Sequence, residues 1–105
     1  MSSKKIWAII DIECVAEREF GFDRTALRIA KFPQVMEVAV VSGRADLMVR
    51  YEADDVHEIS KFVTEVLAPM DGVESTATHF FMKQYKKDGK ILVEEPKASR
   101  LPVSA

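Results

Sequence analysis

Two acidic residues and a histidine are the side chains of this chain that are best suited to acid–base chemistry. Asp11 and Glu13 are two residues apart, so on an extended strand both carboxylates lie on one face. Such a pair can act as general acid and base inside a cavity between sheets. Without that cavity it forms ion pairs at an interface, which is the interpretation we prefer. For His79 we expect a half-buried imidazole held by a hydrogen bond rather than a catalytic group.

A short polar turn and a pair of threonines offer binding chemistry instead. The turn contains Gly43, Arg44, Ala45 and Asp46. Gly43 suits a turn that needs a positive φ, and the carboxylate of Asp46 can cap the turn by accepting from backbone N–H groups. Arg44 is expected to be a solvated turn arginine. Thr76 and Thr78 share one face of a predicted strand, where threonine is common for its β propensity alone.

Composition and missing motifs exclude several classes of function. With one cysteine and two histidines in 105 residues, no metal-ligand spacing exists. We find no glycine-rich phosphate loop and no nucleophile elbow, so no cofactor, metal or catalytic residue is predicted. The formal net charge of −2 argues against direct nucleic-acid binding.

Targeting signals are also missing from the sequence. No apolar run approaches the roughly 18 residues that a membrane span needs, and the start of the chain does not resemble a signal peptide. Cys14, the single cysteine, has no partner for an intramolecular disulfide, in agreement with a reducing compartment. We therefore expect a cytoplasmic protein.

These residues must be positioned by elements that the hydrophobic pattern predicts. Alternating segments indicate strands and stripes at spacings of three and four indicate helices, with Asp23 and Asp55 as N-cap candidates. The predicted elements are a strand over Lys4–Val15, a helix from Asp23 to Phe32, strands over Val35–Ser42 and Leu47–Ala53, a helix from Val56 to Leu67, and a strand over Val73–Tyr85.

The order β-α-β-β-α-β predicts an α+β fold, a ferredoxin-like sandwich whose two helices cover one face of a four-stranded antiparallel sheet. The first strand would turn Trp7 and Ile9 to the other face, and a monomer would leave that patch exposed. We therefore expect two protomers to pack sheet against sheet or to extend a sheet into a closed pair. Residues 1–86 form the domain, and residues 87–105 are a turn, a short edge strand over 91–93 and a loose tail from residue 96.

The hairpin and the last strand together resemble a known family. VVSGRADLMVRY, then a capped helix and GVESTATHFF, is similar to the ligand-binding domain of Lrp/AsnC transcription regulators. The hairpin pattern of the family is matched by Gly43 and Asp46, and the pattern of its last strand by Gly72, Val73, Thr76 and Thr78.

The resemblance implies a homodimer of the dimeric α/β-barrel kind, often with four dimers in a ring and amino-acid effectors in clefts between dimers. It assigns ligand binding to Gly43, Arg44, Ala45, Asp46, Thr76 and Thr78. A turn with free backbone N–H groups beside a carboxylate suits both ends of an amino acid. Arg44 and Ala45 stand where many relatives place a bulky residue.

Only Met1 to Ser3 precede the first predicted strand, so the chain resembles a stand-alone effector domain without a DNA-reading helix-turn-helix. The expected function is a non-enzymatic regulatory domain that binds an amino acid or joins full-length Lrp/AsnC regulators, or both. The alternative is a small dimeric α/β-barrel enzyme, a cofactor-independent monooxygenase or isomerase using His79 or the carboxylate pair. A third possibility is a pure assembly adaptor.

Overall fold

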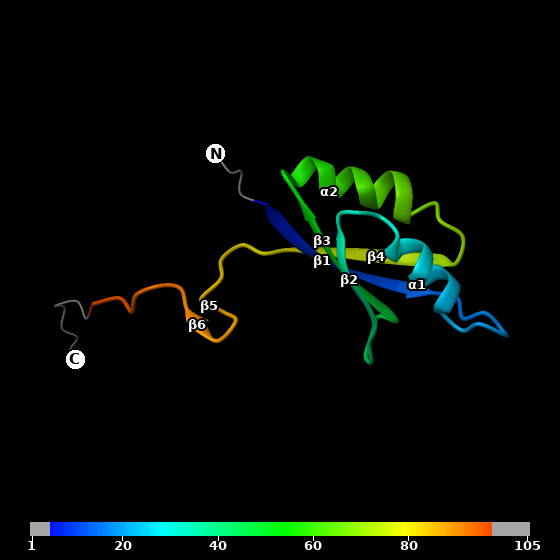
Figure 1. Cartoon of the computed structure of the whole chain (residues 1–105), viewed down its shortest axis with the longest axis horizontal. Helices are drawn as coiled ribbons and strands as arrows, with labels where there is room; N and C mark the ends of the chain where they lie inside the picture. Colours follow the sequence, from blue (N-terminus) through cyan, green and yellow to red (C-terminus); the bar gives the residue numbers. More distant parts are fainter. Residues whose placement is uncertain (1–4, 98–105) are drawn as a thin grey trace, which may run out of the picture.

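A four-stranded antiparallel sheet with strand order β2-β3-β1-β4 forms the centre of the computed structural model, which describes residues 5–97 (Figure 1). Its elements are β1 (Ile6–Cys14), α1 (Asp23–Ala30), β2 (Val35–Val40), β3 (Leu47–Ala53), α2 (Val56–Phe62), η1 (Val63–Leu67) and β4 (Val73–Phe80), followed by a separate hairpin of β5 (Lys86–Lys87) and β6 (Lys90–Ile91). The predicted ferredoxin-like α+β fold is confirmed. No helix in the described part is long and apolar enough to cross a membrane.

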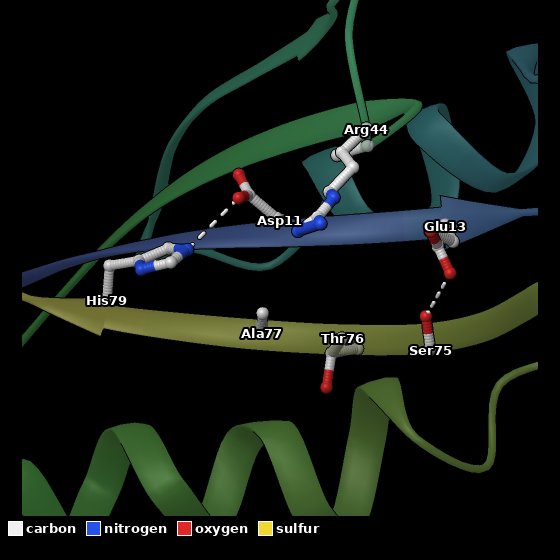
Figure 2. A pocket seen from close by; sticks show the side chains of 8 residues that line it. Asp11, Glu13, Arg44, Ser75, Thr76, Ala77 and His79 are labelled. Carbon is white, nitrogen blue, oxygen red and sulfur yellow. Dashed lines mark hydrogen bonds and ion pairs between the residues drawn. The ribbon is translucent and has the colours of Figure 1, made fainter.

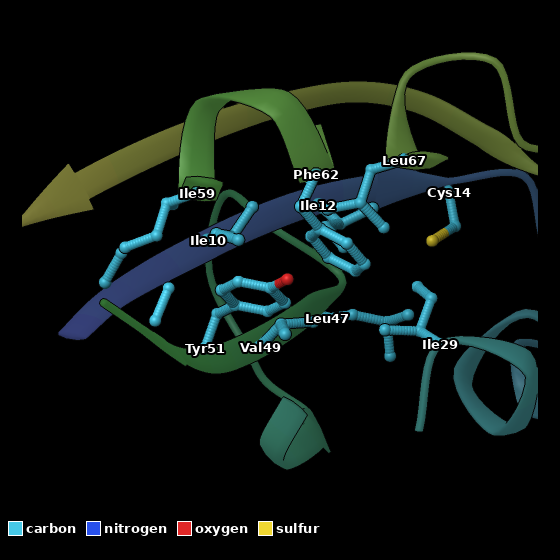
Figure 3. Packing of buried hydrophobic residues seen from close by; sticks show 12 residues of the cluster. Ile10, Ile12, Cys14, Ile29, Leu47, Val49, Tyr51, Ile59, Phe62 and Leu67 are labelled. Carbon is cyan, nitrogen blue, oxygen red and sulfur yellow. The ribbon is translucent and has the colours of Figure 1, made fainter. Parts of the chain in front are cut away.

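The hydrophobic core lies between the sheet and its helices (Figure 3). β1 contributes every second residue, and Ala8, Ile10 and Ile12 are completely buried. Leu47 and Val49 of β3 and Ile59 of α2 are buried beside them. The alternation of β1 therefore decides which face receives the helices.

The two helices begin differently. The carboxylate of Asp55 accepts a hydrogen bond of 2.8 Å from the backbone N–H of Glu58, which confirms the predicted N-cap of α2. The N-cap predicted at Asp23 is wrong: Phe22 holds the N-cap position of α1, no side chain caps it, and Asp23 is the first helical residue. Its carboxylate is then limited to a favourable interaction with the helix dipole.

The second helix changes its winding half-way. After Phe62 it continues as the π-helical turn η1, where the N–H of Ala68 donates to the carbonyl of Val63 at 2.8 Å. A π turn holds one more residue than an α turn. It places Leu67 in the core, fully buried, where the amphipathic pattern also predicted an inward position.

The last strand ends five residues earlier than predicted, at Phe80. Residues 81–96, the C-terminal arm, then leave the sheet. Inside the arm, β5 and β6 pair with each other and do not extend the main sheet, so the short strand predicted over 91–93 overlaps β6 only at Ile91. The predicted tail lies, except for residues 96 and 97, outside the described residues.

The face of the sheet without helices, the open face, is only half-buried rather than bare. The ring of Trp7 is covered by the guanidinium of Arg50, 3.9 Å from its centroid, and by the ammonium of Lys87 at 4.3 Å. Phe81 lies 6.3 Å away, ring to ring. Charged side chains from β3 and the arm thus shield part of the predicted apolar patch.

Candidate functional site

A pocket of about 340 Å³ opens on the open face beside the β2–β3 turn (Figure 2). Antiparallel pairing sets Asp11 opposite Ala77 and Glu13 opposite Ser75, so these side chains share one face. The turn adds a wall above them. The lining residues are Asp11, Glu13, Arg44, Ala45, Ser75, Thr76, Ala77 and His79.

Both carboxylates of the pocket hold a partner from β4. Nε2 of His79 lies 3.0 Å from Oδ2 of Asp11, and since a carboxylate only accepts, the imidazole nitrogen is the donor. The hydroxyl of Ser75 donates to Oε1 of Glu13 at 2.6 Å. Within residues 5–97 the second oxygen of each carboxylate has no hydrogen-bond partner, so it can accept from a ligand. The predicted hydrogen-bonded state of His79 is thus observed, but the imidazole is exposed rather than half-buried.

Arg44 brings a positive charge to the same place. Its side chain extends from the turn over β1, between Asp11 and Glu13 (Figure 2). It is exposed, as expected for a turn arginine, and among the described residues its guanidinium has no ion-pair partner. A guanidinium presents several donors in one plane, which fits a carboxylate. The methyl groups of Ala45 and Ala77 supply an apolar part of the wall.

Asp46 lies in the same turn but holds the fold together. β1 has an irregularity between Glu13 and Cys14 that interrupts its ladder with β4. The freed N–H of Cys14 donates to Oδ2 of Asp46 at 2.8 Å, and the N–H of Asp46 donates to the carbonyl of Ile12 at 3.0 Å. The Asp46 carboxylate therefore caps a backbone group of β1 instead of the hairpin turn itself. Burial, then the charges of Asp46 and Glu74, raise the pKa of the Cys14 thiol to about 11.

The two predicted threonines face away from this pocket. Thr76 pairs with Ile12 and Thr78 with Ile10, so their side chains lie on the helix-covered side of the sheet. Figure 2 shows the Thr76 hydroxyl turned away from Asp11 and Glu13, although Thr76 still lines the rim. Gly43, with a φ of +114°, shapes the turn as expected. Of the six predicted ligand residues, the pocket gathers Arg44, Ala45 and Thr76, whereas Gly43, Asp46 and Thr78 do not line it.

Comparison with known proteins supplies the family. The family model of the Lrp/AsnC ligand-binding domain matches residues 7–91. The chain belongs to the Lrp/AsnC family.

Most relatives of this Lrp/AsnC domain are HTH-type transcriptional regulators, and one is a homocitrate synthase of Sulfurisphaera tokodaii, 31% identical over 81 residues that cover 77% of this chain and 17% of that enzyme. YugG, an HTH-type transcriptional regulator of Bacillus subtilis, is 37% identical over 99 residues, which cover 94% of this chain and 60% of YugG. This chain thus spans less than two thirds of that relative's length. Among solved structures, TTHA0845 of Thermus thermophilus has a TM-score of 0.70 and 32% identity, covering 78% of this chain and 99% of that one.

A third comparison concerns fold only. The regulator NMB0573 of Neisseria meningitidis, solved as a complex with L-Met, has a TM-score of 0.66 and 21% identity. The match covers 83% of this chain and 56% of that one.

Sequence reasoning named the pocket carboxylates of this Lrp/AsnC domain but not as ligand residues, and it missed Ser75 and Ala77. The sequence signal that could have found them is that Ser75, Ala77 and His79 occupy alternate positions of one strand, so all three lie on the same face. The register that brings them to Asp11 and Glu13 is a property of the paired strands. No group of three or more histidine, cysteine or acidic side chains within residues 5–97 is arranged to hold a metal ion.

Proposed function

We propose that this Lrp/AsnC domain is a non-enzymatic regulatory module that binds a free amino acid in the pocket beneath Arg44. The observation that carries the proposal is the juxtaposition of one unpaired guanidinium with two carboxylates in one open pocket. An amino acid needs donors for its carboxylate and acceptors for its ammonium group. Arg44 supplies the donors, and the free oxygens of Asp11 and Glu13 supply the acceptors.

The proposal includes a homodimer built through the open face. That face carries Trp7, Ile9 and Met48 between charged side chains, and helices cover only the other side of the sheet. A second sheet over it would narrow the pocket, exclude water and strengthen both ion pairs with a ligand. Tetramers of dimers, as in a ring, would add further contacts at the β2–β3 turns.

The partners we propose are other Lrp/AsnC regulators, because most relatives of this chain are HTH-type transcriptional regulators. Such a partner would supply the DNA contacts, and this module would report the effector. We accordingly expect the module to act in the cytoplasm, beside the regulators it joins. Most relatives being regulators also supports this function over the monooxygenase or isomerase alternative, since the match to homocitrate synthase covers only 17% of that enzyme.

Thermal unfolding in the presence of each amino acid at millimolar concentration tests the effector. L-methionine belongs in the set because the Neisseria regulator was solved with L-Met. A ligand of the native state at 100 times its Kd stabilises by about 2.7 kcal/mol, which is a shift of several degrees in Tm. No shift with any amino acid would contradict the sensor role.

The substitution Arg44→Gln should then weaken binding of the active amino acid at least about tenfold, since it removes the guanidinium proposed to hold the ligand carboxylate. Arg18→Gln is the matched control, because Arg18 is exposed in the β1–α1 connector and lines no part of the pocket. Isothermal titration calorimetry measures both. Equal affinity of the two variants would place the ligand elsewhere.

A further inference from the structure

The C-terminal arm has a sequence and a shape that the single chain does not explain. Every residue from 81 to 92 is exposed, although the segment is rich in large apolar side chains. Met82 is 92% exposed and Ile91 is 68% exposed. The other large apolar side chains of the arm that are exposed are Phe81, Tyr85 and Leu92. Contiguous apolar surface of this kind marks an interaction site.

The arm is also ordered into a hairpin that has little to hold it. β5 and β6 are two residues each, joined at Asp88 and Gly89, and the N–H of Leu92 donates to the carbonyl of Tyr85 at 2.8 Å. A lone two-stranded hairpin is marginal in water, and one this short needs a surface to pack on. Its one aromatic anchor on the body of the protein is Trp7, which Phe81 and Lys87 approach.

The direction of the arm points to where that surface lies. Trp7 belongs to the open face, so the hairpin reaches past the open face rather than back over the helices. Figure 1 shows β5 and β6 beyond the end of the sheet, away from both helices. The radius of gyration is 18.3 Å, against about 13 Å for a compact domain of this length. The arm therefore projects away from the body of its own chain, where it is accessible to a second copy.

The charges of the arm and of the open face indicate which partner the arm contacts. The hairpin part of the arm, residues 83–90, carries four lysines, Lys83, Lys86, Lys87 and Lys90, against the single carboxylate of Asp88, and Glu94 and Glu95 follow near the end of the arm. The open face carries four carboxylates, on Asp11, Glu13, Glu37 and Glu52, against the guanidinium groups of Arg44 and Arg50. The basic hairpin of the arm and the acidic open face of the same chain are complementary, and such complementarity steers association.

We propose that the C-terminal arm clasps a second copy of this chain, packing its apolar side chains on the rim of that copy's open face while its lysines meet the acidic groups there. Two copies would exchange arms reciprocally. A hollow of about 660 Å³ in the arm, walled by Tyr85, Ile91 and Val93 among others, receives side chains of the second copy. This inference rests on the proposed pairing of open faces.

Sedimentation equilibrium of the full chain tests the clasp. The double variant Met82→Ser with Ile91→Ser should raise the dimer dissociation constant at least about tenfold, because two anchors leave the interface. Leu27→Ser is the matched control, since Leu27 is 63% exposed on α1, on the other side of the sheet, and it should leave the dimer unchanged. All three side chains are exposed, so none of these changes disturbs the core.

The possible outcomes distinguish the contribution of the arm to dimerisation from that of the paired open faces. A dimer of unchanged stability in the double variant overturns the arm exchange and leaves the pairing of open faces standing. A wild-type chain that stays monomeric at micromolar concentration overturns both. If Leu27→Ser weakens the dimer as much as the double variant does, the clasp is overturned as well, because the loss of affinity then comes from removing any exposed apolar side chain.

Photocrosslinking supplies a direct contact map. A photoreactive phenylalanine analogue at position 82, in a mixture of unlabelled and ¹⁵N-labelled copies, should give mixed-isotope links to peptides of β1, β2 or β3. Links confined to one copy, or links to peptides of the helices, would overturn the proposal.

Discussion

Arg44 and Asp46 are two residues apart in one turn, yet their side chains serve different purposes. Arg44 extends over the pocket, and Asp46 reaches the N–H of Cys14 at the interruption of β1. One side chain of the turn thus lines the pocket, while the other is tied to the architecture. With the proposed role of Arg44, ligand specificity and stability can change independently in this turn.

Replacing Asp46 with Ala should lower the free energy of unfolding by about 2 kcal/mol, because a partly buried N–H loses a charged acceptor. Asp46→Asn keeps an acceptor oxygen and should lose about 1 kcal/mol or less. Urea denaturation measures both. Asp71→Ala is the control, because the Asp71 side chain is exposed, and a loss there equal to that of Asp46→Ala would show that the capping bond contributes nothing.

At the residue scale the sequence predicted the turn at Gly43 and a capping role for Asp46. It could not predict that the capped group is the backbone N–H of Cys14. The Cys14 N–H is free only because the β1–β4 ladder shifts after Glu13. A register shift depends on two strands that are far apart in sequence. The same reason explains why Ser75 was not expected beside Glu13.

At the scale of elements, the turn between η1 and β4 is fitted tightly to α1. Gly72 has a φ of +92°, and a β-carbon there would lie 2.6 Å from Oγ1 of Thr25, a buried residue of α1. Gly43 also has a positive φ but open space around it. Two glycines with similar backbone needs therefore differ in what surrounds them.

Gly72→Ala should destabilise by roughly 2–3 kcal/mol, since both backbone strain and overpacking apply, and Gly43→Ala by about 1 kcal/mol from strain alone. The Tm values and denaturation midpoints of the two variants test this order. In a Thr25→Ala background the Gly72→Ala loss should shrink, because the clashing hydroxyl is gone. If Gly72→Ala loses as much stability in that background as in the wild type, the destabilisation comes entirely from backbone strain at the positive φ.

Strand and helix identities followed from periodicity, because β1 alternates and α2 keeps its apolar stripe. The end of β4 was harder to predict, since the alternation runs on through residue 85 although pairing with β1 stops at Phe80. The ladder stops at the Ala8–Phe80 pair although β1 itself reaches Ile6, and the pairing of two strands is not visible in local sequence. The π turn at Val63–Leu67 was also missed, because one extra residue per turn hardly disturbs an amphipathic stripe.

At the scale of the whole molecule, the Cys14 thiol couples folding to pH. The thiol is buried, and its pKa rises from an ordinary 9.0 to about 11. The folded protein therefore holds the thiol proton more tightly than the unfolded chain does. Stability from this source is complete below pH 9 and is lost as the pH rises from 9 through 11.

The free energy of unfolding should fall by roughly 2–3 kcal/mol more in the wild type than in Cys14→Ala across that interval. The comparison matters because burial also raises the pKa of Tyr51, and that contribution is common to both proteins. Urea melts at a series of alkaline pH values measure the difference. Parallel pH profiles for the two proteins would show that the thiol does not titrate as described.

The buried state of this one thiol also makes the chain a convenient background for spectroscopy. Cys14 is the single cysteine of the sequence, it is 7% exposed, and its raised pKa leaves little thiolate to react at neutral pH. A cysteine introduced at an exposed site such as Leu92 would take up a fluorophore or spin label selectively, with Cys14 left in place. Distances between labels on two chains could then be followed during assembly in solution.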